Sequence, residues 1–271
     1  MSTPTLLRVR SVWISDVHLG FRGCQAEKLL DFLHSIETEY LYLVGDIVDF
    51  WSLQKSSYWP QQHTNVFRSI LGKAKHGTKV IYVPGNHDEV MREYSGYLFG
   101  NVEVHLDYEH ETADGKKLLI LHGDEFDTIV KHSQMIAKLG SWAYDMLLQL
   151  NQYVNIFRKI FKRDYWSLAK YLKLKVKNAV NYIGSFETAL AHLARDRQVD
   201  GVVCGHIHHA EIRHINDILY CNDGDWVESC SSMIEHDDGS LELIYWNEDY
   251  KRTLTPLSDA EQIIEDNRHV A

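Results

Sequence analysis

Residues 9–18 decide the fold of this chain, and they read VRSVWISDVH. Residues 9–15 are mostly β-branched, aliphatic or aromatic, which predicts a buried strand that ends where Asp16 begins. Two further runs, YLYLV at 40–44 and KVIYV at 79–83, have a similar composition and lead directly into polar motifs. We therefore expect three neighbouring strands that each end at a group of polar side chains.

Helical spacing separates these strands. Apolar residues recur at steps of three and four in two stripes, which are Leu29, Leu30, Leu33 and Ile36, and Val66, Phe67, Ile70 and Leu71. Alternating strands and helices are typical of a layered α/β protein, in which ligands bind beyond the carboxyl ends of the strands. The polar motifs therefore stand where this class of fold places its sites.

The second half predicts more strands and a helical insertion. Strands are expected at 118–121, which ends at His122, and at 199–204, with several short strands following through Tyr245. Between them, apolar residues at helical spacing predict at least two long amphipathic helices. We expect a sheet domain made of residues 1–124 and 197–255, a helical cap at 125–196, and a polar tail at 256–271.

Composition limits the class of protein. The chain has 271 residues, 45% of them hydrophobic, and no apolar run approaches the ~20 residues that a membrane helix requires. No secretory signal is visible at the start, so a cytoplasmic chain is expected. The net charge of −10 argues against broad nucleic-acid binding, which needs many basic residues. The four cysteines have no repeated spacing, which favours reduced, buried thiols over a zinc site or disulfides.

Five short motifs carry metal-ligand residues at these strand ends. They are DVH at 16–18, GDIVD at 45–49, GNHD at 85–88, HGD at 122–124 and GHIH at 205–208. Because alternate residues of a strand face one side, the pairs Asp16 and His18, and His206 and His208, are each expected to point at one ion. Asp46 is the candidate bridge between two ions, Asn86 offers an amide oxygen and His122 an imidazole.

Enough ligands are present for two metal ions. Such a site is suited to phosphoryl-ester hydrolysis, because metal binding lowers the pKa of a water and neutralises charge on the phosphoryl oxygens. Mixed imidazole and carboxylate ligands favour Mn, Fe, Co or Zn over Ca, whereas Mg prefers oxygen ligands. Each motif alone could be a plain turn or an incidental pair of polar residues, but the ordered set of five points to a metal centre.

The five motifs together resemble the calcineurin-like metallophosphoesterase superfamily, from about Val12 to His208. The resemblance implies a four-layer αββα sandwich and Mn(II) as the first choice of metal. It also implies two ligand sets, which are Asp16, His18, Asp46 and His208, and Asp46, Asn86, His122 and His206. His87 would act as the general acid and Asp49 would orient it, unless Asp49 only caps a loop. Asp88 and Asp124 could hydrogen-bond the ligand histidines.

The cap reverses the charge of the chain. Residues 146–182 contain eight basic residues against one acid, interleaved with aromatic residues. This pattern suits a membrane surface or a phosphorylated lipid, although a solvated structural face is the simpler explanation and nucleic acid a weaker one. The candidate substrate-binding residues are Arg158, Lys162, Lys170, Lys173 and Lys177.

Within the superfamily, the cap and residues 222–226 (NDGDW) resemble the UDP-2,3-diacylglucosamine pyrophosphatase group of lipid A biosynthesis. Such an enzyme cleaves a nucleotide-lipid to UMP and a lipid monophosphate, as a peripheral protein of the inner membrane. The best-known branch has Arg and Glu where this chain has His87 and Asp49, so it would be a divergent relative. The alternatives are a soluble phosphomonoesterase or nucleotide phosphodiesterase, and a non-catalytic binding module.

Overall fold

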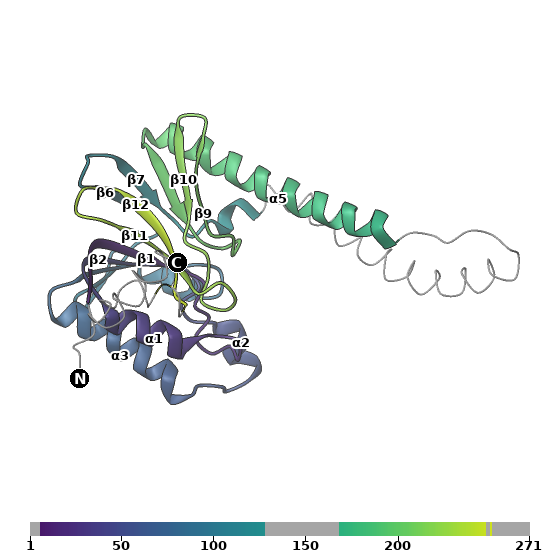
Figure 1. Ribbon diagram of the computed structural model, residues 1–271. Coiled ribbons are helices and arrows are strands. Elements are labelled where there is room, and N and C mark those ends of the chain that lie inside the picture. The colour runs from purple at the N-terminus through teal and green to yellow at the C-terminus, as the bar shows by residue number, and fades with distance from the viewer. Residues whose placement is uncertain (1–5, 128–167, 248–249, 251–271) are drawn as a thin grey trace, which may run out of the picture. The chain divides into compact units, whose positions relative to one another are not determined.

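The computed structural model describes residues 6–127, 168–247 and 250, and only the backbone of 168–181. The chain divides into two compact units, one made of residues 1–123 and 194–271 and the other of residues 124–193. The first unit contains two β-sheets and the helices that pack on them (Figure 1). This mixed two-sheet architecture confirms the predicted α/β class.

The larger sheet has seven strands in the order β12-β11-β1-β2-β3-β5-β4. Its centre is parallel, because β1 pairs with β2, β2 with β3 and β3 with β5 in the same direction. The strands are β1 (Leu7–Ile14), β2 (Ile36–Val44), β3 (Lys79–Val83), β4 (Leu98–Phe99), β5 (Val102–Val104), β11 (Ser231–Glu235) and β12 (Leu241–Tyr245). The three strands predicted first therefore lie side by side, with their carboxyl ends at one edge.

The smaller sheet has five strands in the order β6-β7-β8-β10-β9. Its central strands β7, β8 and β10 are parallel, and β6 and β9 pair antiparallel at the two edges. The strands are β6 (Tyr108–Glu111), β7 (Lys117–Ile120), β8 (Gly201–Cys204), β9 (Glu211–Ile215) and β10 (Ile218–Asn222). The motifs at 122–124 and 205–208 follow β7 and β8, again at the ends of parallel strands.

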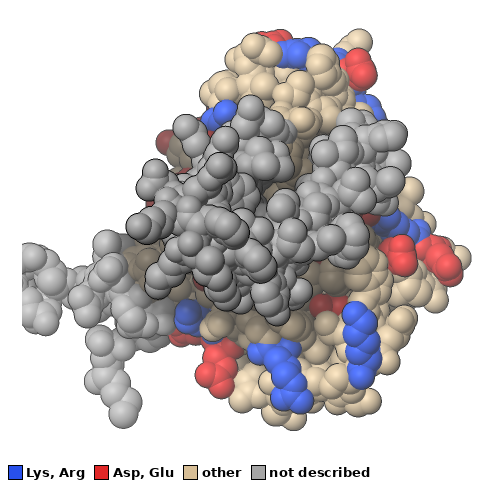
Figure 2. Space-filling model, turned by 90° about the vertical axis from the view of Figure 1, so that its right-hand side faces the viewer, with Lys and Arg blue, Asp and Glu red and all other residues tan. Residues whose placement is uncertain are grey.

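The described helices are α1, α2, α3 and α5, with two short 3-10 turns. Their bounds are α1 (Ala26–Ser35), α2 (Phe50–Lys55), α3 (Gln61–Lys75), α5 (Leu168–Arg197), η1 (Glu89–Tyr94) and η2 (Asp124–Phe126). None of these helices combines the length and the apolar character that crossing a bilayer requires. The part of the predicted cap at 128–167 and the predicted tail at 256–271 lie outside the described residues and are among those drawn in grey in Figure 2.

Two residues differ from the predicted helical stripes. Ile36 begins β2, where it pairs with Leu7, because α1 ends at Ser35 and the backbone of Ile36 is extended. Leu71 is 52% exposed. The face of α3 that packs inward contains residues spaced by four, Val66, Ile70 and Ala74, and Leu71 stands one position off that line.

Two apolar cores share the strands of the larger sheet. Alternate residues of β1 face opposite sides, as the period of a strand requires. Val12 and Ile14 belong to the core that includes Phe32 of α1 and Val66 of α3. Trp13 belongs to the other core, which holds residues of both sheets, among them Ile120 of β7. The mostly apolar sequence of β1 is thus explained by burial on both faces.

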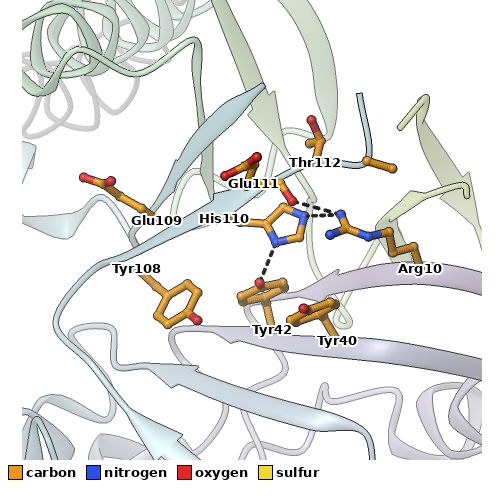
Figure 3. A pocket seen from close by; sticks show the side chains of 9 residues that line it. Arg10, Tyr40, Tyr42, Tyr108, Glu109, His110, Glu111 and Thr112 are labelled. Carbon is orange, nitrogen blue, oxygen red and sulfur yellow. Dashed lines mark hydrogen bonds between the residues drawn. The ribbon is translucent and has the colours of Figure 1, made fainter. Parts of the chain in front are cut away.

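A buried polar network also joins the two sheets, and Figure 3 shows the part of it that links His110 to Tyr42 and Arg10. Glu235, fully buried, accepts hydrogen bonds from Arg10 at 2.7 Å, from Ser11 at 2.5 Å and from Nε2 of His110 at 2.8 Å. Nδ1 of the same imidazole lies 2.7 Å from the Tyr42 hydroxyl. A cavity of about 460 Å³ opens beside these residues.

The carboxylate of Glu235 is held in its charged form. Burial alone would raise its pKa, but the hydrogen bonds from His110, Ser11 and the backbone of Ala113 lower the pKa to about 2. A carboxylate whose pKa falls on folding stabilises the protein above its unfolded pKa and loses this effect as the pH falls towards the folded value. The network therefore contributes stability at neutral pH.

Replacing Glu235 by Gln should lower the free energy of unfolding at pH 7 by about 3 kcal/mol, the equivalent of the pKa shift. The difference from the parent protein should shrink below pH 4.5, where an unfolded Glu235 becomes protonated. Urea unfolding between pH 7 and pH 3 measures both effects. Glu242→Gln, at an exposed carboxylate beside His236, is the matched control and should change little. An equal effect of the two variants at pH 7 would contradict the account.

Candidate metal centre

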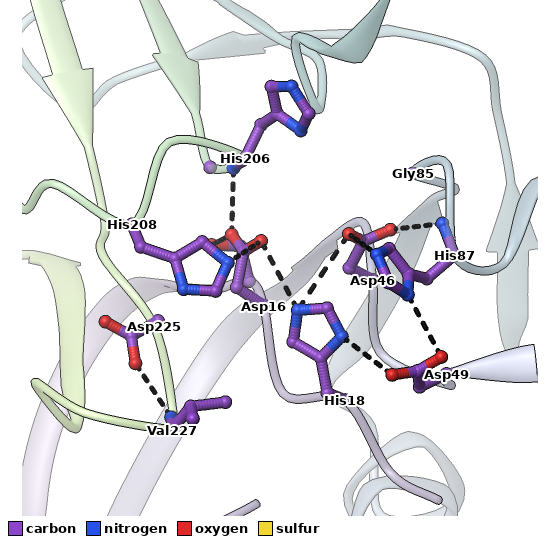
Figure 4. Close-up of polar contacts among 12 residues, drawn as sticks. Asp16, His18, Asp46, Asp49, Gly85, His87, His206, His208, Asp225 and Val227 are labelled. Atoms are coloured by element: carbon purple, nitrogen blue, oxygen red, sulfur yellow. Dashed lines mark hydrogen bonds and ion pairs between the residues drawn. The ribbon is translucent and has the colours of Figure 1, made fainter. Parts of the chain in front are cut away.

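All five motifs lie on loops directly after parallel strands. Figure 4 shows residues of the motifs at 16–18, 45–49, 85–88 and 205–208. We expected strand alternation to orient Asp16 with His18, and His206 with His208, and this was wrong. Strand β1 already ends at Ile14, and Asp16 and His18 have positive φ angles of 49° and 54°. His206 and His208 also have positive φ, at 68° and 52°. Left-handed backbone costs a non-glycine residue about 1–2 kcal/mol, and such strain gathers at functional sites. Turns in the loops, and not the alternation of a strand, therefore orient the side chains of these pairs.

One group of ligand atoms consists of Asp16, His18 and His208, whose atoms all lie within 4.8 Å of one another. Nε2 of His208 is 3.0 Å and Nε2 of His18 is 3.9 Å from Oδ1 of Asp16. Burial would raise the pKa of Asp16, but the hydrogen bond from His208 and the nearby imidazoles hold it well below its ordinary value. Asp16 is therefore ionised and could bind a cation beside these histidines.

A second group consists of Asp16, Asp46 and His122, again within 4.8 Å. Nδ1 of His122 donates to the carbonyl of Val44 at 2.8 Å, which directs Nε2 towards Oδ2 of Asp46 at 3.4 Å. Burial opposes ionisation of Asp46, but its interaction with His122 lowers the pKa of Asp46 below the ordinary value. Oδ2 of Asp46 also lies 4.0 Å from Nε2 of His18, so Asp46 reaches both groups and the two cation positions would be adjacent.

Asn86 and His206 stand close to this second group in the fold, since the amide of His87, next to Asn86, donates to Oδ1 of Asp46 at 2.7 Å. The side-chain oxygen of Asn86 is buried and has no hydrogen-bond partner among the described residues, as expected of an oxygen that binds a cation. The His206 imidazole lies 5.2 Å from that of His122, between ring centroids. A Cβ at Gly85 would come within 2.7 Å of Nε2 of His122 and would clash with Asp46. Carboxylate, imidazole and amide donors fit a divalent transition ion.

Asp49 both caps a helix and contacts His87. Its side chain accepts from the backbone of Ser52 at 2.7 Å, which caps α2, and its Oδ1 lies 3.0 Å from Nδ1 of His87. Oδ2 also lies 3.4 Å from Nδ1 of His18. Burial opposes its ionisation, but these hydrogen bonds keep the pKa of Asp49 well below its usual range. With Nδ1 held by Asp49, Nε2 of His87 faces Asp46 at 4.0 Å.

Asp88 was expected to hydrogen-bond the ligand histidines, but its described hydrogen bonds go to other groups. It accepts from the backbone amides of Ile47 at 2.8 Å and Gly85 at 2.6 Å, and from the Tyr82 hydroxyl. Its buried carboxyl thereby ties the loop after β2 to the loop after β3. Asp124 begins η2.

The sequence motifs did not include Trp51. Its indole lies 4.2 Å from the imidazole of His87, between ring centroids, and its side chain is 42% exposed. The sequence could have indicated Trp51, because it follows Asp49 by two residues and lies on the helix that Asp49 caps. Trp51 therefore covers one side of the histidine beside the candidate metal centre.

The five candidate substrate-binding residues of the cap have no described side chains. Arg158 and Lys162 lie outside the described residues, and Lys170, Lys173 and Lys177 are in α5, where only the backbone is described. Their role stays a prediction.

Comparison with known proteins gives a consistent family. Residues 9–210 match the model of the calcineurin-like phosphoesterases. A UDP-2,3-diacylglucosamine hydrolase of Aliivibrio fischeri is 27% identical over 84% of this chain and 94% of the relative. The hydrolase of the same name from Tolumonas auensis is 30% identical, over 49% of this chain and 54% of that protein.

Among solved structures, an archaeal phosphodiesterase covers 87% of this chain and 98% of its own, with a TM-score of 0.41 and 13% sequence identity. A likeness this loose has no bearing on function.

The close packing at Gly85 predicts that a larger side chain there weakens cation binding. Gly85→Ala should weaken cation binding at least about tenfold, because the added methyl group displaces Asp46 or His122. Titration calorimetry with Mn(II) measures the affinity, and thermal unfolding checks that the variant is folded.

Gly72→Ala is the matched control, since a Cβ at this position in α3 meets nothing within 4 Å. It should leave cation binding unchanged and stabilise the helix by about 0.5–1 kcal/mol. Parent-like Mn(II) affinity in folded Gly85→Ala would contradict the packing described around this glycine.

Proposed function

The chain belongs to the calcineurin-like phosphoesterase family, and we propose that it hydrolyses a phosphodiester or pyrophosphate bond of a UDP-2,3-diacylglucosamine-type nucleotide-lipid, releasing UMP and a lipid monophosphate. Membership makes it a metal-dependent hydrolase. The observation that carries the proposal is the convergence of carboxylate, imidazole and amide donors from five strand ends around Asp16 and Asp46. This set of ligands is suited to two divalent cations, which would neutralise charge on a phosphoryl group.

The proposed ligands form two sets that share Asp46. Asp16, His18, Asp46 and His208 would hold one divalent cation, and Asp46, Asn86, His122 and His206 the other, with Mn(II) as the proposed metal. Two such cations supply a water of lowered pKa and neutralise charge on the phosphoryl oxygens. The protein's part is to keep both carboxylates ionised and to fix the imidazole tautomers, as the Val44 carbonyl does for His122.

His87 is the proposed general acid. Asp49 holds its Nδ1, so Nε2 is the atom that faces the site and can donate a proton to the leaving oxygen. Trp51 and the edge of His18, 4.6 Å away between ring centroids, limit the rotation of the ring. This arrangement supports a role in protonating the leaving group.

The relatives support the proposed nucleotide-lipid substrate. Relatives named for UDP-2,3-diacylglucosamine match this chain over most of their length, as in Aliivibrio fischeri and Neisseria gonorrhoeae. A phosphorylated lipid substrate would also explain why the cap is rich in basic residues. We therefore propose that the cap binds the phosphorylated lipid and contacts an anionic membrane surface. Its proposed binding residues are Arg158, Lys162, Lys170, Lys173 and Lys177.

The substrate proposal is tested by comparing three compounds with Mn(II)-loaded protein. UDP-2,3-diacylglucosamine should be cleaved with a kcat/KM at least about 100-fold above that of UDP-N-acetylglucosamine, because binding of the acyl chains contributes to the transition state. Bis-p-nitrophenyl phosphate gives the rate without either specific group. Product analysis by mass spectrometry should find UMP.

Asp46→Ala should abolish hydrolysis of all three compounds, which confirms that one centre is responsible. A diacyl substrate cleaved no faster than bis-p-nitrophenyl phosphate would overturn the lipid proposal. That result would favour the soluble phosphodiesterase.

The role of His87 predicts a dependence on the leaving group. His87→Ala should slow hydrolysis of alkyl phosphodiesters by about 10²–10⁴-fold, since their leaving oxygen needs a proton, and should slow p-nitrophenyl esters much less. Steady-state kinetics across a series of leaving groups measures this. His209→Ala, at a neighbouring imidazole whose side chain is 52% exposed, should affect neither class. Equal losses for good and poor leaving groups would rule out the acid role.

A further inference from the structure

A second buried aspartate lies behind the candidate metal centre. Asp223 follows β10 in the NDGDW segment, and its side chain is fully buried. Ser15 stands between Asp223 and the proposed ligand Asp16, and its hydroxyl contacts both carboxyl groups. None of the roles described so far uses Asp223.

The hydrogen-bond geometry around Ser15 requires an additional proton. Oγ of Ser15 lies 2.6 Å from Oδ2 of Asp16, 2.6 Å from Oδ1 of Asp223 and 3.1 Å from the carbonyl of Gly224. A hydroxyl has a single hydrogen to donate, and an ionised carboxylate can only accept. Two ionised carboxylates could not both be hydrogen-bonded to Ser15, so one of the two acids must donate.

The surroundings place that proton on Asp223. Oδ2 of Asp16 already accepts from the His206 amide at 2.9 Å, and Asp16 is a proposed cation ligand, a role that requires its ionised form. The other oxygen of Asp223, Oδ2, is buried and has no hydrogen-bond partner among the described residues. An ionised carboxylate with such an oxygen would be strongly disfavoured, whereas a neutral acid tolerates it.

The electrostatic environment agrees with this assignment. Burial and the charge of Asp16 raise the pKa of Asp223 well above its ordinary value. Asp225, two residues further along, has a different environment, because its carboxylate accepts from the backbone amide of Val227 at 2.8 Å (Figure 4). The two aspartates of this segment therefore have different partners: backbone amides surround Asp225, whereas Asp223 faces the Ser15 hydroxyl.

We propose that Asp223 is a neutral hydrogen-bond donor to Ser15, and that Ser15 in turn donates to Oδ2 of Asp16 and so positions that carboxylate for its cation. The chain of bonds runs from Asp223 Oδ1–H to Ser15 Oγ, and from Ser15 Oγ–H to Asp16. It leaves Oδ1 of Asp16 facing His208 and His18. Asp223 and Ser15 are positioning residues, and this role rests on the proposed metal centre.

The packing at this point leaves little room for another arrangement. A Cβ at Gly205 would clash with both Ser15 and Asp16. The side-chain amide of Asn222 donates to the Gly205 carbonyl at 2.7 Å, which anchors the loop that carries His206 and His208. The two loops are therefore fixed around Ser15.

The test compares Asp223→Asn with Asp223→Ala and Ser15→Ala. An asparagine amide can still donate to Ser15, so Asp223→Asn should bind two Mn(II) ions with affinities within about threefold of the parent. Asp223→Ala and Ser15→Ala should each weaken one of the two ions by about 10–100-fold and leave the other unchanged. Titration calorimetry and Mn(II) electron paramagnetic resonance measure stoichiometry and affinity without any substrate.

Infrared spectroscopy tests the protonation state directly. The parent protein at neutral pH should show the carbonyl band of a buried protonated carboxylic acid, which Asp223→Asn should remove and Ser15→Ala should shift. Ser15→Ala deletes a single oxygen, so it remains informative if Asp223→Ala fails to fold.

The proposal is overturned if Asp223→Asn loses the ion as Asp223→Ala does, if Ser15→Ala binds both ions like the parent, or if the carbonyl band is missing. Two-ion binding by the parent without cleavage of the nucleotide-lipid would refute the proposed substrate and leave this inference standing.

Discussion

Two buried carboxylates, Asp16 and Asp46, lie side by side, and their mutual repulsion is the constraint on which the site depends. Their ligand atoms are within 4.8 Å of each other in one group with His122. At this separation, two negative charges repel by about 3 kcal/mol if the effective dielectric constant is about 20. Imidazoles surround both carboxylates and keep their pKa values low. Divalent cations would relieve the repulsion, which is why this arrangement is suited to metal-dependent hydrolysis.

The two sheets make this arrangement possible. Parallel strands of both sheets deliver their carboxyl ends to one region, and both faces of β1 are buried, so the strand that leads to Asp16 is rigid. The loops that follow take up left-handed conformations at several of the proposed ligands. The cost of these conformations is offset by hydrogen bonds that tie loops together, such as those of Asp88 to the loop after β2.

The neighbouring positions of β1, β2 and β3 could be predicted from the sequence, because the ends of these strands that lead into the motifs are mostly apolar and buried. The helical stripes were less reliable at their ends. Ile36 has the same apolar character in a helix or a strand, and only pairing with β1 determines which it adopts. Leu71 continues an apolar run but stands off the buried line of α3.

The motifs identified residues that the structure brings together, but they did not predict which backbone conformation orients the side chains. The expected alternation along a strand failed, because β1 stops two residues before Asp16. The contacts of Asp223 with Ser15 join residues 208 positions apart, and no local pattern could indicate that a buried acid there would be neutral. Similarly, the contact of Trp51 with His87 depends on the meeting of α2 with the loop after β3.

Diffraction from crystals of the Mn(II)-loaded protein, recorded at the manganese absorption edge, tests the central claim most directly. The account predicts two anomalous peaks about 3.5–4 Å apart. One should lie among Asp16, His18 and His208, the other among Asn86, His122 and His206, with Asp46 between them. A single peak, or two peaks that do not share Asp46, would contradict the two-cation centre from which the proposed chemistry follows.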